Sequence, residues 1–135
     1  MSRPKAGRPR PVHRMSLPRP FRLTRRRDYE LVRMRGRSQG GRLLAVAVLE
    51  QPTVPRVKAG IIVPKALGSA VTRNLIKRRL REIVRSSLGE LAVHQFVVTI
   101  ARRGAVDADF ATLVAEWKYL VRRLRALDNP ESSRP

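Results

Sequence analysis

The sequence predicts a single α+β domain in which helices cover a mixed central β-sheet. Its 135 residues, 42% of them hydrophobic, are enough for one compact core with short terminal extensions. Three short apolar runs have the length of buried strands, and longer stretches between and after them carry apolar residues at helical spacing. These observations predict the order α-β-β-(β)-α-β-α, in which the strand in brackets is optional.

The chain divides into an arm, a domain and a tail. Residues 1–20 contain six basic residues, five prolines and no acidic residue, a composition typical of disorder. The prolines also oppose the amphipathic helix of a mitochondrial transit peptide. The domain is predicted to span residues 21–128, and the polar residues 129–135 form the tail.

The first predicted elements are a helix and a strand. Thr24 is predicted to cap a helix over residues 25–34, which ends before Gly36. Residues 37–42, RSQGGR, are predicted to be flexible. Residues 43–49, LLAVAVL, are continuously apolar rather than alternating, which predicts a strand buried on both faces.

Two further strands flank a long helical stretch. Residues 57–63 predict a strand that Pro64 stops, and residues 95–101, QFVVTIA, predict the next one. The segment between them, residues 64–88, turns into a helix with an apolar stripe of Ile76, Leu80, Ile83 and Val84.

The last helix is predicted to begin at Asp107 or Asp109, either of which can cap it, and to run to Leu127. Its apolar residues recur at spacings of three and four and form one stripe. Trp117 belongs to this stripe, so we interpret it as a core residue rather than as a platform for stacking a base.

A formal net charge of +20 indicates a polyanionic partner, because such a surplus opposes compaction unless it is neutralised. The charge is concentrated in residues 1–36 and 65–85. A membrane binder would need a wide exposed apolar face as well, and no apolar run approaches the roughly 18 residues of a membrane span. The absence of cysteine excludes disulfides, thiolate catalysis and cysteine-ligated metal sites.

One face of the helix within residues 64–88 predicts phosphate binding. At 100° per residue, an arc of about 60° contains four polar side chains, with Lys77 on its flank: Asn74, Arg78, Arg81 and Arg85. Like-charged pairs four residues apart destabilise a helix, and only Glu82, through Arg78, offers relief. Phosphates lying against the helix explain why it tolerates this repulsion. Arg73 lies in the first turn, and Asn74 is able to orient an arginine, bind a ribose or base, or cap the helix.

The pattern Arg73-Asn74-x-x-Lys77-Arg78-x-x-Arg81-Glu82 resembles the arginine-rich signature of the protein subunit of bacterial ribonuclease P. Three flanking segments resemble the same family: LPRPFRLTRRRDYELVRMRG, GIIVPKALGSAVTRN and FVVTIARRGA. The resemblance covers about residues 17–125.

This resemblance implies a small α+β subunit that binds a large catalytic RNA. In that family the RNA carries out a magnesium-dependent hydrolysis that removes the 5′ leader of precursor tRNA, and the protein holds the leader between its first helix and the sheet. The resemblance also implies a left-handed crossover between two parallel strands, against the usual rule. It further implies a cytoplasmic protein that is monomeric when free and binds no membrane.

Site residues follow from the resemblance position by position. Those expected to contact the catalytic RNA are the signature residues, joined by Arg85 of the same face: Arg73, Asn74, Lys77, Arg78, Arg81 and Arg85. Gly68 matches the turn before the helix. The expected leader cleft contains Tyr29, Arg33, Phe21 and Lys65, although Phe21 is equally well explained as a core anchor. Arg33 and Ala47 stand where the family often has aromatic residues, so leader contacts are expected to rely more on charge and less on stacking.

Protein-only catalysis is not expected. His13 lies in the arm, His94 lies in a turn, and the close pair Asp107 and Asp109 is explained by helix capping. Magnesium is therefore expected to be held mainly by the RNA. Two other hypotheses are a structural RNA-binding protein, such as a small ribosomal protein, and a DNA-compacting protein. The second is the weaker one, because the sequence shows no motif that reads a DNA groove.

Overall fold

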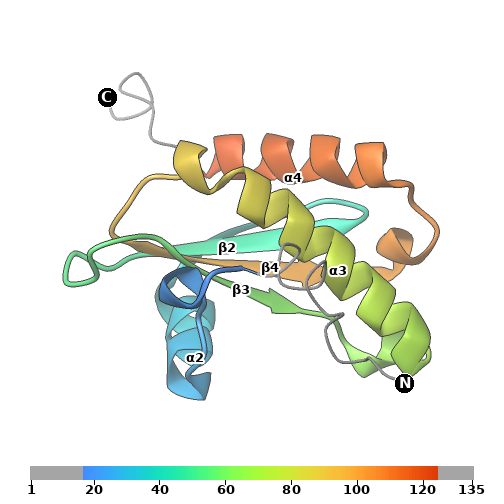
Figure 1. The fold of residues 1–135 in the computed structure, drawn as a ribbon, viewed down its shortest axis with the longest axis horizontal. Helices are drawn as coiled ribbons and strands as arrows, with labels where there is room; N and C mark the ends of the chain where they lie inside the picture. The colour runs from blue at the N-terminus through green and yellow to red at the C-terminus, as the bar shows by residue number, and fades with distance from the viewer. Residues whose placement is uncertain (1–16, 125–135) are drawn as a thin grey trace, which may run out of the picture.

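A computed structural model describes residues 17–124 as a four-stranded sheet with three α-helices (Figure 1). In chain order the elements are α2 (Arg26–Arg35), β1 (Arg37–Gly40), β2 (Leu44–Glu50), β3 (Lys58–Ile62), α3 (Ala70–Ser86), β4 (Gln95–Ala101) and α4 (Phe110–Arg123). The strand order in the sheet is β1-β2-β4-β3. The first three of these strands are antiparallel neighbours, whereas β3 and β4 are parallel, so the mixed sheet is confirmed.

Two local predictions before β2 are wrong. Residues 37–40 form the edge strand β1, which pairs with β2 in the register Arg37↔Val48 to Gly40↔Ala45. Its sequence, RSQG, has no apolar alternation, because β1 is held by backbone pairing and contributes little to the core. The N-cap of α2 is Arg25 rather than Thr24, and no side chain caps this helix.

The sheet has a core on each face because its central strands carry apolar side chains on both sides. The larger core, which includes Val46, Val48 and Val97, packs under α3 and α4. The smaller core includes Ala47 and Val98 and packs against α2. Figure 1 shows α3 and α4 above the sheet and α2 below it. The prediction that the strand at residues 43–49 is buried on both faces is thereby confirmed.

Trp117 is completely buried, and its Nε1–H donates a hydrogen bond to Oγ1 of Thr99 at 3.0 Å. The interpretation of this tryptophan as a core residue is confirmed. The N-cap of α4 is Asp109, whose carboxylate accepts from the backbone N–H of Thr112 at 2.8 Å. Hydrogen bonds from the side chain and the backbone N–H of Thr112 lower the pKa of Asp109. The predicted helix end at Leu127 lies outside the described residues.

The segment from β3 through α3 to β4 connects two parallel strands that are neighbours in the sheet. The crossover that the sequence predicts is therefore present, and its left hand stays a prediction. The chain before α2 also reaches this edge of the sheet, since the backbone N–H of Leu23 donates to the carbonyl of Ala59 at 2.9 Å. The first helix is thus anchored beside β3.

Candidate nucleic-acid interface

The turn before α3 depends on a glycine and a serine. Gly68 has a φ of 146°, which L side chains rarely adopt, and lies in the turn as predicted. Ser69 is the N-cap, and its Oγ accepts a hydrogen bond from the backbone N–H of Thr72 at 3.2 Å. Capping is therefore not the role of Asn74.

The apolar stripe of α3 faces the sheet. Its four predicted members are all buried: Ile76, Leu80, Ile83 and Val84. The other side of the helix consequently faces solvent, where Asn74 and Arg78 are exposed and Lys77, Arg81 and Arg85 are half-buried. The structure thus brings the five candidate residues from Asn74 onward to one side of α3, as the helical spacing predicts.

The charges of α3 are only partly neutralised within the protein. Glu82 accepts two hydrogen bonds from Arg85 at 2.9 Å, so the predicted relief through Arg78 is wrong. Arg73 donates through Nε to the carbonyl of Gly68 at 3.1 Å. In residues 17–124, Lys77, Arg78 and Arg81 make no hydrogen bond or ion pair. These three cations are therefore available to phosphates.

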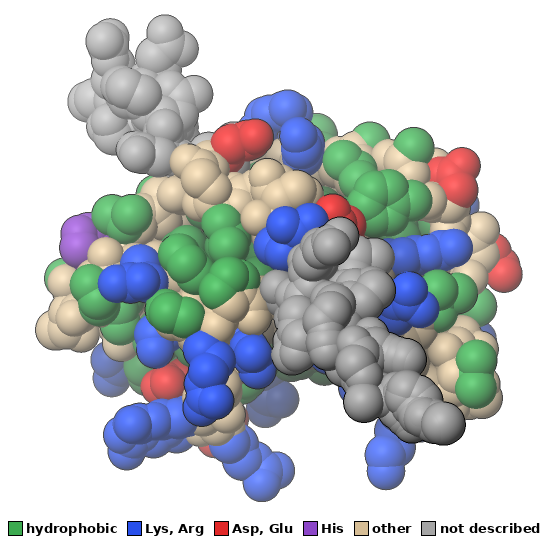
Figure 2. All heavy atoms as spheres, viewed as in Figure 1, with side chains coloured by type: hydrophobic (Ala, Val, Ile, Leu, Met, Phe, Trp, Pro, Cys, Tyr) green, Lys and Arg blue, Asp and Glu red, His purple; other side chains and the backbone are tan. Residues whose placement is uncertain are grey.

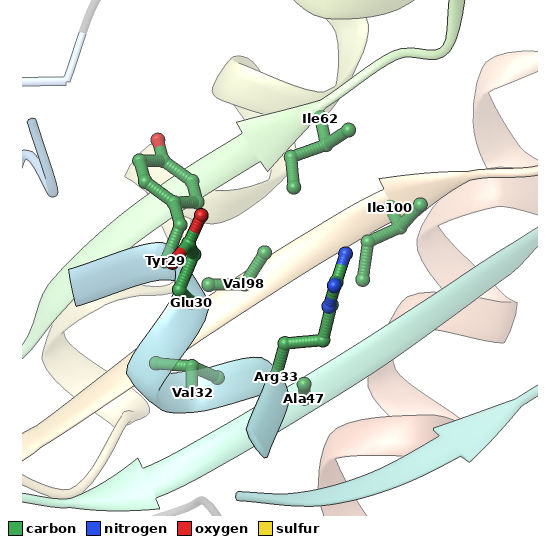
Figure 3. Close-up of a pocket in the computed structure, with 8 residues that line it drawn as sticks. All are labelled: Tyr29, Glu30, Val32, Arg33, Ala47, Ile62, Val98 and Ile100. Atoms are coloured by element: carbon green, nitrogen blue, oxygen red, sulfur yellow. The ribbon is translucent and has the colours of Figure 1, made fainter. Parts of the chain in front are cut away.

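A second feature lies on the opposite face of the sheet. A cavity of about 130 Å³ opens between α2 and the strands (Figure 3). It is lined by Tyr29, Glu30, Val32, Arg33, Ala47, Ile62, Val98 and Ile100. The structure thus brings together Tyr29, Arg33 and Ala47, the three positions that the sequence assigned to the leader cleft or noted beside it.

Phe21 and Lys65, two other residues predicted for the cleft, do not line this pocket. Phe21 packs against the larger core, and the guanidinium of Arg56 lies 5.6 Å from the centre of its ring. The structure favours the core role for Phe21. Lys65 is exposed on a short 3-10 helix (Lys65–Leu67) beyond the end of β3.

Tyr29 is held in place at the hydroxyl end of its ring. Its hydroxyl donates to the carbonyl of Leu23 at 2.9 Å. The ring lies so close to Gly60 that a Cβ atom there would be 2.5 Å from Cε1 and 2.6 Å from Cζ. Burial raises the pKa of Tyr29, an effect that the backbone of Ile61 and the charge of Arg81 partly offset.

The floor of the pocket comes from alternate residues of three strands. Ala47 pairs with Val98, and Ile100 pairs with Ile62, so these four side chains share one face of the sheet. Sequence reasoning missed Ile62, Val98 and Ile100 as site residues. Alternation along each strand predicts that such residues share one face of the sheet. It does not predict which part of that face α2 leaves uncovered.

Basic side chains accompany both features. Figure 2 shows Lys and Arg side chains gathered around α2, and α3 carries Lys77, Arg78 and Arg81. These helices lie on opposite faces of the sheet, yet the positive charge of Arg81 on α3 lowers the pKa of Tyr29 on α2 and so partly offsets the effect of burial. The arrangement therefore offers a basic surface along α3 and a mainly apolar hollow beside α2.

The described part of the chain contains no group of three or more side chains able to hold a metal ion. None of its helices is long and apolar enough to cross a membrane. His94 is exposed, and its Nδ1 lies 2.6 Å from the carbonyl of Val54. His13 lies outside the described residues.

Comparison with known sequences points to one family. The model of the family described as Ribonuclease P matches residues 17–125. A ribonuclease P protein component from Streptomyces griseus is 40% identical over 116 residues, covering 80% of this chain and 94% of the relative. One from Acidothermus cellulolyticus is 37% identical over 118 residues, covering 87% of this chain and 98% of the relative.

Solved structures of the same name share the fold. The RNase P protein from Thermotoga maritima matches with a TM-score of 0.68 and 29% identity, covering 76% of this chain and 96% of that protein. The Staphylococcus aureus RNase P protein matches with a TM-score of 0.74 and 24% identity, covering 80% of this chain and 98% of that protein. The predicted α+β class is confirmed by these neighbours.

Proposed function

Because the chain belongs to the ribonuclease P protein family, we propose that the basic face of α3 and the pocket beside α2 divide the work of tRNA processing between them. As the protein component of this endoribonuclease, the chain associates with the ribonuclease P RNA and the tRNA substrate. The exposed side of α3 binds the catalytic RNA, and the pocket beside α2 binds the 5′ leader. A small ribosomal protein is not favoured, since the relatives described above are ribonuclease P protein components.

The observation that carries this proposal is the placement of the two surfaces on opposite faces of one thin sheet. On α3, Lys77, Arg78 and Arg81 lack partners in the described part of the protein and present donors that suit phosphate oxygens. Beside α2, Tyr29 and Arg33 border a pocket with an apolar floor. One chain can therefore contact a large RNA and a substrate strand at the same time.

The metal chemistry belongs to the RNA in this proposal. Magnesium prefers carboxylate, water and phosphate oxygens, and the described residues do not bring three candidate ligands together. We therefore infer that RNA phosphates, rather than a cage of protein side chains, hold the ion. The contribution of the protein is to place positive charge beside RNA strands.

Leader binding is tested in the assembled holoenzyme with precursor tRNA and mature tRNA. Tyr29→Ala should weaken binding of the leader-bearing precursor more than binding of mature tRNA. Tyr119→Ala is the matched control, because Tyr119 is 55% exposed on α4, on the other side of the sheet. Equal losses for both tRNAs in Tyr29→Ala would show that Tyr29 has only a structural role.

Binding to the catalytic RNA is tested through its salt dependence. Arg78→Ala should weaken binding and reduce the slope of log K against log salt by about 0.7–0.9, the change expected for one lost phosphate contact. Arg122→Ala, an exposed arginine on α4, serves as the charge-matched control. An unchanged slope for Arg78→Ala would exclude Arg78 from the RNA interface.

A further inference from the structure

The rim of the pocket beside α2 carries two opposite charges. Glu30 and Arg33 are three residues apart on α2, so they lie on the same side of the helix, and both line the pocket (Figure 3). Arg33 makes no hydrogen bond or ion pair within residues 17–124. The ion pair of Glu30 with Arg26 is long, 3.8 Å, and both side chains are mostly exposed, at 60% and 92%. Such a pair contributes little, so both rim groups are available to a ligand.

A glutamate in this position is unfavourable for binding phosphates alone. Its carboxylate repels the RNA backbone that the surrounding arginines of α2 attract. The same carboxylate accepts hydrogen bonds from N–H groups, and in RNA these groups lie on the edges of unpaired bases. Glu30 therefore indicates contact with a base edge rather than with the backbone.

The pocket floor suits the face of an aromatic ring. It consists of aliphatic side chains without hydrogen-bonding groups, including Val98, Ile100 and Ile62. A cavity of about 130 Å³ is close in size to the ~150 Å³ cavity known to admit benzene. The six-membered ring of a base therefore fits against the floor, and the five-membered ring of a purine extends toward the rim. The polar edges of the base must turn toward the rim, since the floor cannot satisfy them.

We propose that this pocket binds one unpaired guanine of the leader. Arg33 donates to O6 and N7 of the base, and Glu30 accepts from N1–H and N2–H. Guanine alone among the four RNA bases offers both two adjacent acceptors and two adjacent donors, which match a guanidinium and a carboxylate at two places on the rim of one pocket. This inference rests on the proposed leader-binding function and adds a base preference to it.

The first experiment scans the leader for a guanosine preference. Precursor tRNAs carry a leader of adenosines with a single guanosine at each position in turn, and their affinities for the holoenzyme are measured. Guanosine at one position should increase affinity by about fivefold or more, the gain expected from one good bidentate contact. At that position, inosine removes the N2 amino group and 7-deazaguanosine removes the N7 acceptor.

The modified bases connect each edge of guanine to one residue. Arg33→Ala should abolish the difference between guanosine and 7-deazaguanosine, and Glu30→Ala should abolish the difference between guanosine and inosine. Arg27→Ala is the control, since Arg27 is exposed on the same helix and does not line the pocket. This variant should lower affinity for all leaders alike and keep the guanosine preference.

The outcomes separate this inference from the proposed function. Equal affinity for adenosine and guanosine at every position, with the precursor still bound more tightly than mature tRNA, overturns the guanine pocket and leaves leader binding intact. A guanosine preference that persists in both Arg33→Ala and Glu30→Ala also overturns it. Loss of any difference between precursor and mature tRNA in the wild-type holoenzyme would instead overturn leader binding itself.

Discussion

Replacing Gly60 with alanine tests whether the position of Tyr29 depends on the glycine beneath it. An added Cβ would lie 2.5 Å from Cε1 of Tyr29, and closer still to its hydroxyl oxygen. Carbon atoms in contact are normally about 3.5–4.0 Å apart. The ring must therefore move away from β3 by about 1 Å, because the backbone of a paired strand cannot yield as easily as a side chain.

The size of the effect follows from this displacement. A shift of about 1 Å would break the 2.9 Å hydrogen bond from Tyr29 to the carbonyl of Leu23, a net loss of about 0.5–1.5 kcal/mol. Overpacking typically destabilises the folded state by about 1–3 kcal/mol. Alanine also restricts the unfolded chain more than glycine does, which stabilises the protein by about 0.4–1 kcal/mol. We expect Gly60→Ala to lower the free energy of unfolding by about 1–3 kcal/mol and to impair leader discrimination in the holoenzyme.

Gly89→Ala provides the matched control, because a Cβ at Gly89 would meet no atom within 4 Å. This variant should be neutral or slightly stabilising, by up to about 1 kcal/mol. Urea denaturation of both variants measures the stability difference, and precursor and mature tRNA binding measures the functional one. Equal unfolding free energies for Gly60→Ala and Gly89→Ala would refute the contact argument.

Three further predictions concern polar groups that hold the domain together. Trp117→Phe should lower the free energy of unfolding by about 1–3 kcal/mol because it leaves the buried hydroxyl of Thr99 without its donor. The double variant with Thr99→Val should recover part of this stability. If the effects of the two substitutions were fully additive, this explanation would be wrong. Glu116→Ala should lower the free energy of unfolding by about 1–3 kcal/mol, since one carboxylate oxygen accepts from the backbone N–H groups of Leu43 and Leu44 at 2.7 and 2.8 Å. In urea melts, Glu116→Gln should retain most of the stability. Burial raises the pKa of Tyr29. The neutral Tyr29 side chain therefore adds to the free energy of unfolding below about pH 10, and this contribution is lost as the pH rises through the folded-state pKa. Wild type should therefore lose more stability than Tyr29→Phe between pH 9 and 11, and parallel losses would argue against a perturbed tyrosine.

Most elements were predictable because their signals are local. The run at residues 95–101 contains enough consecutive apolar residues to indicate a buried strand without reference to its partners, and β4 has those bounds. The stripe of α3 and the burial of Trp117 follow from helical spacing in the same way. Asp109 also caps α4, one of the two residues that the sequence allowed.

Other features depended on contacts that no local pattern reports. Strand β1 exists because its backbone pairs with β2, so its polar sequence carries no sign of it. Glu82 lies within reach of both Arg78 and Arg85 along the helix, and packing decides in favour of Arg85. Phe21 packs against the larger core and does not line the pocket beside α2.

Most of the elements, the basic face of α3 and the family signature could be predicted from the sequence, because each is encoded by side chains that lie close together along the chain. The meeting of Glu30, Arg33 and Ala47 with Val98 and Ile62 around one cavity depends on tertiary packing. Those residues come from α2, β2, β4 and β3, and their proximity results from strand order, register and the anchoring of α2 beside β3. Such long-range placement depends on how the whole core packs, which the spacing of residues along the chain does not specify.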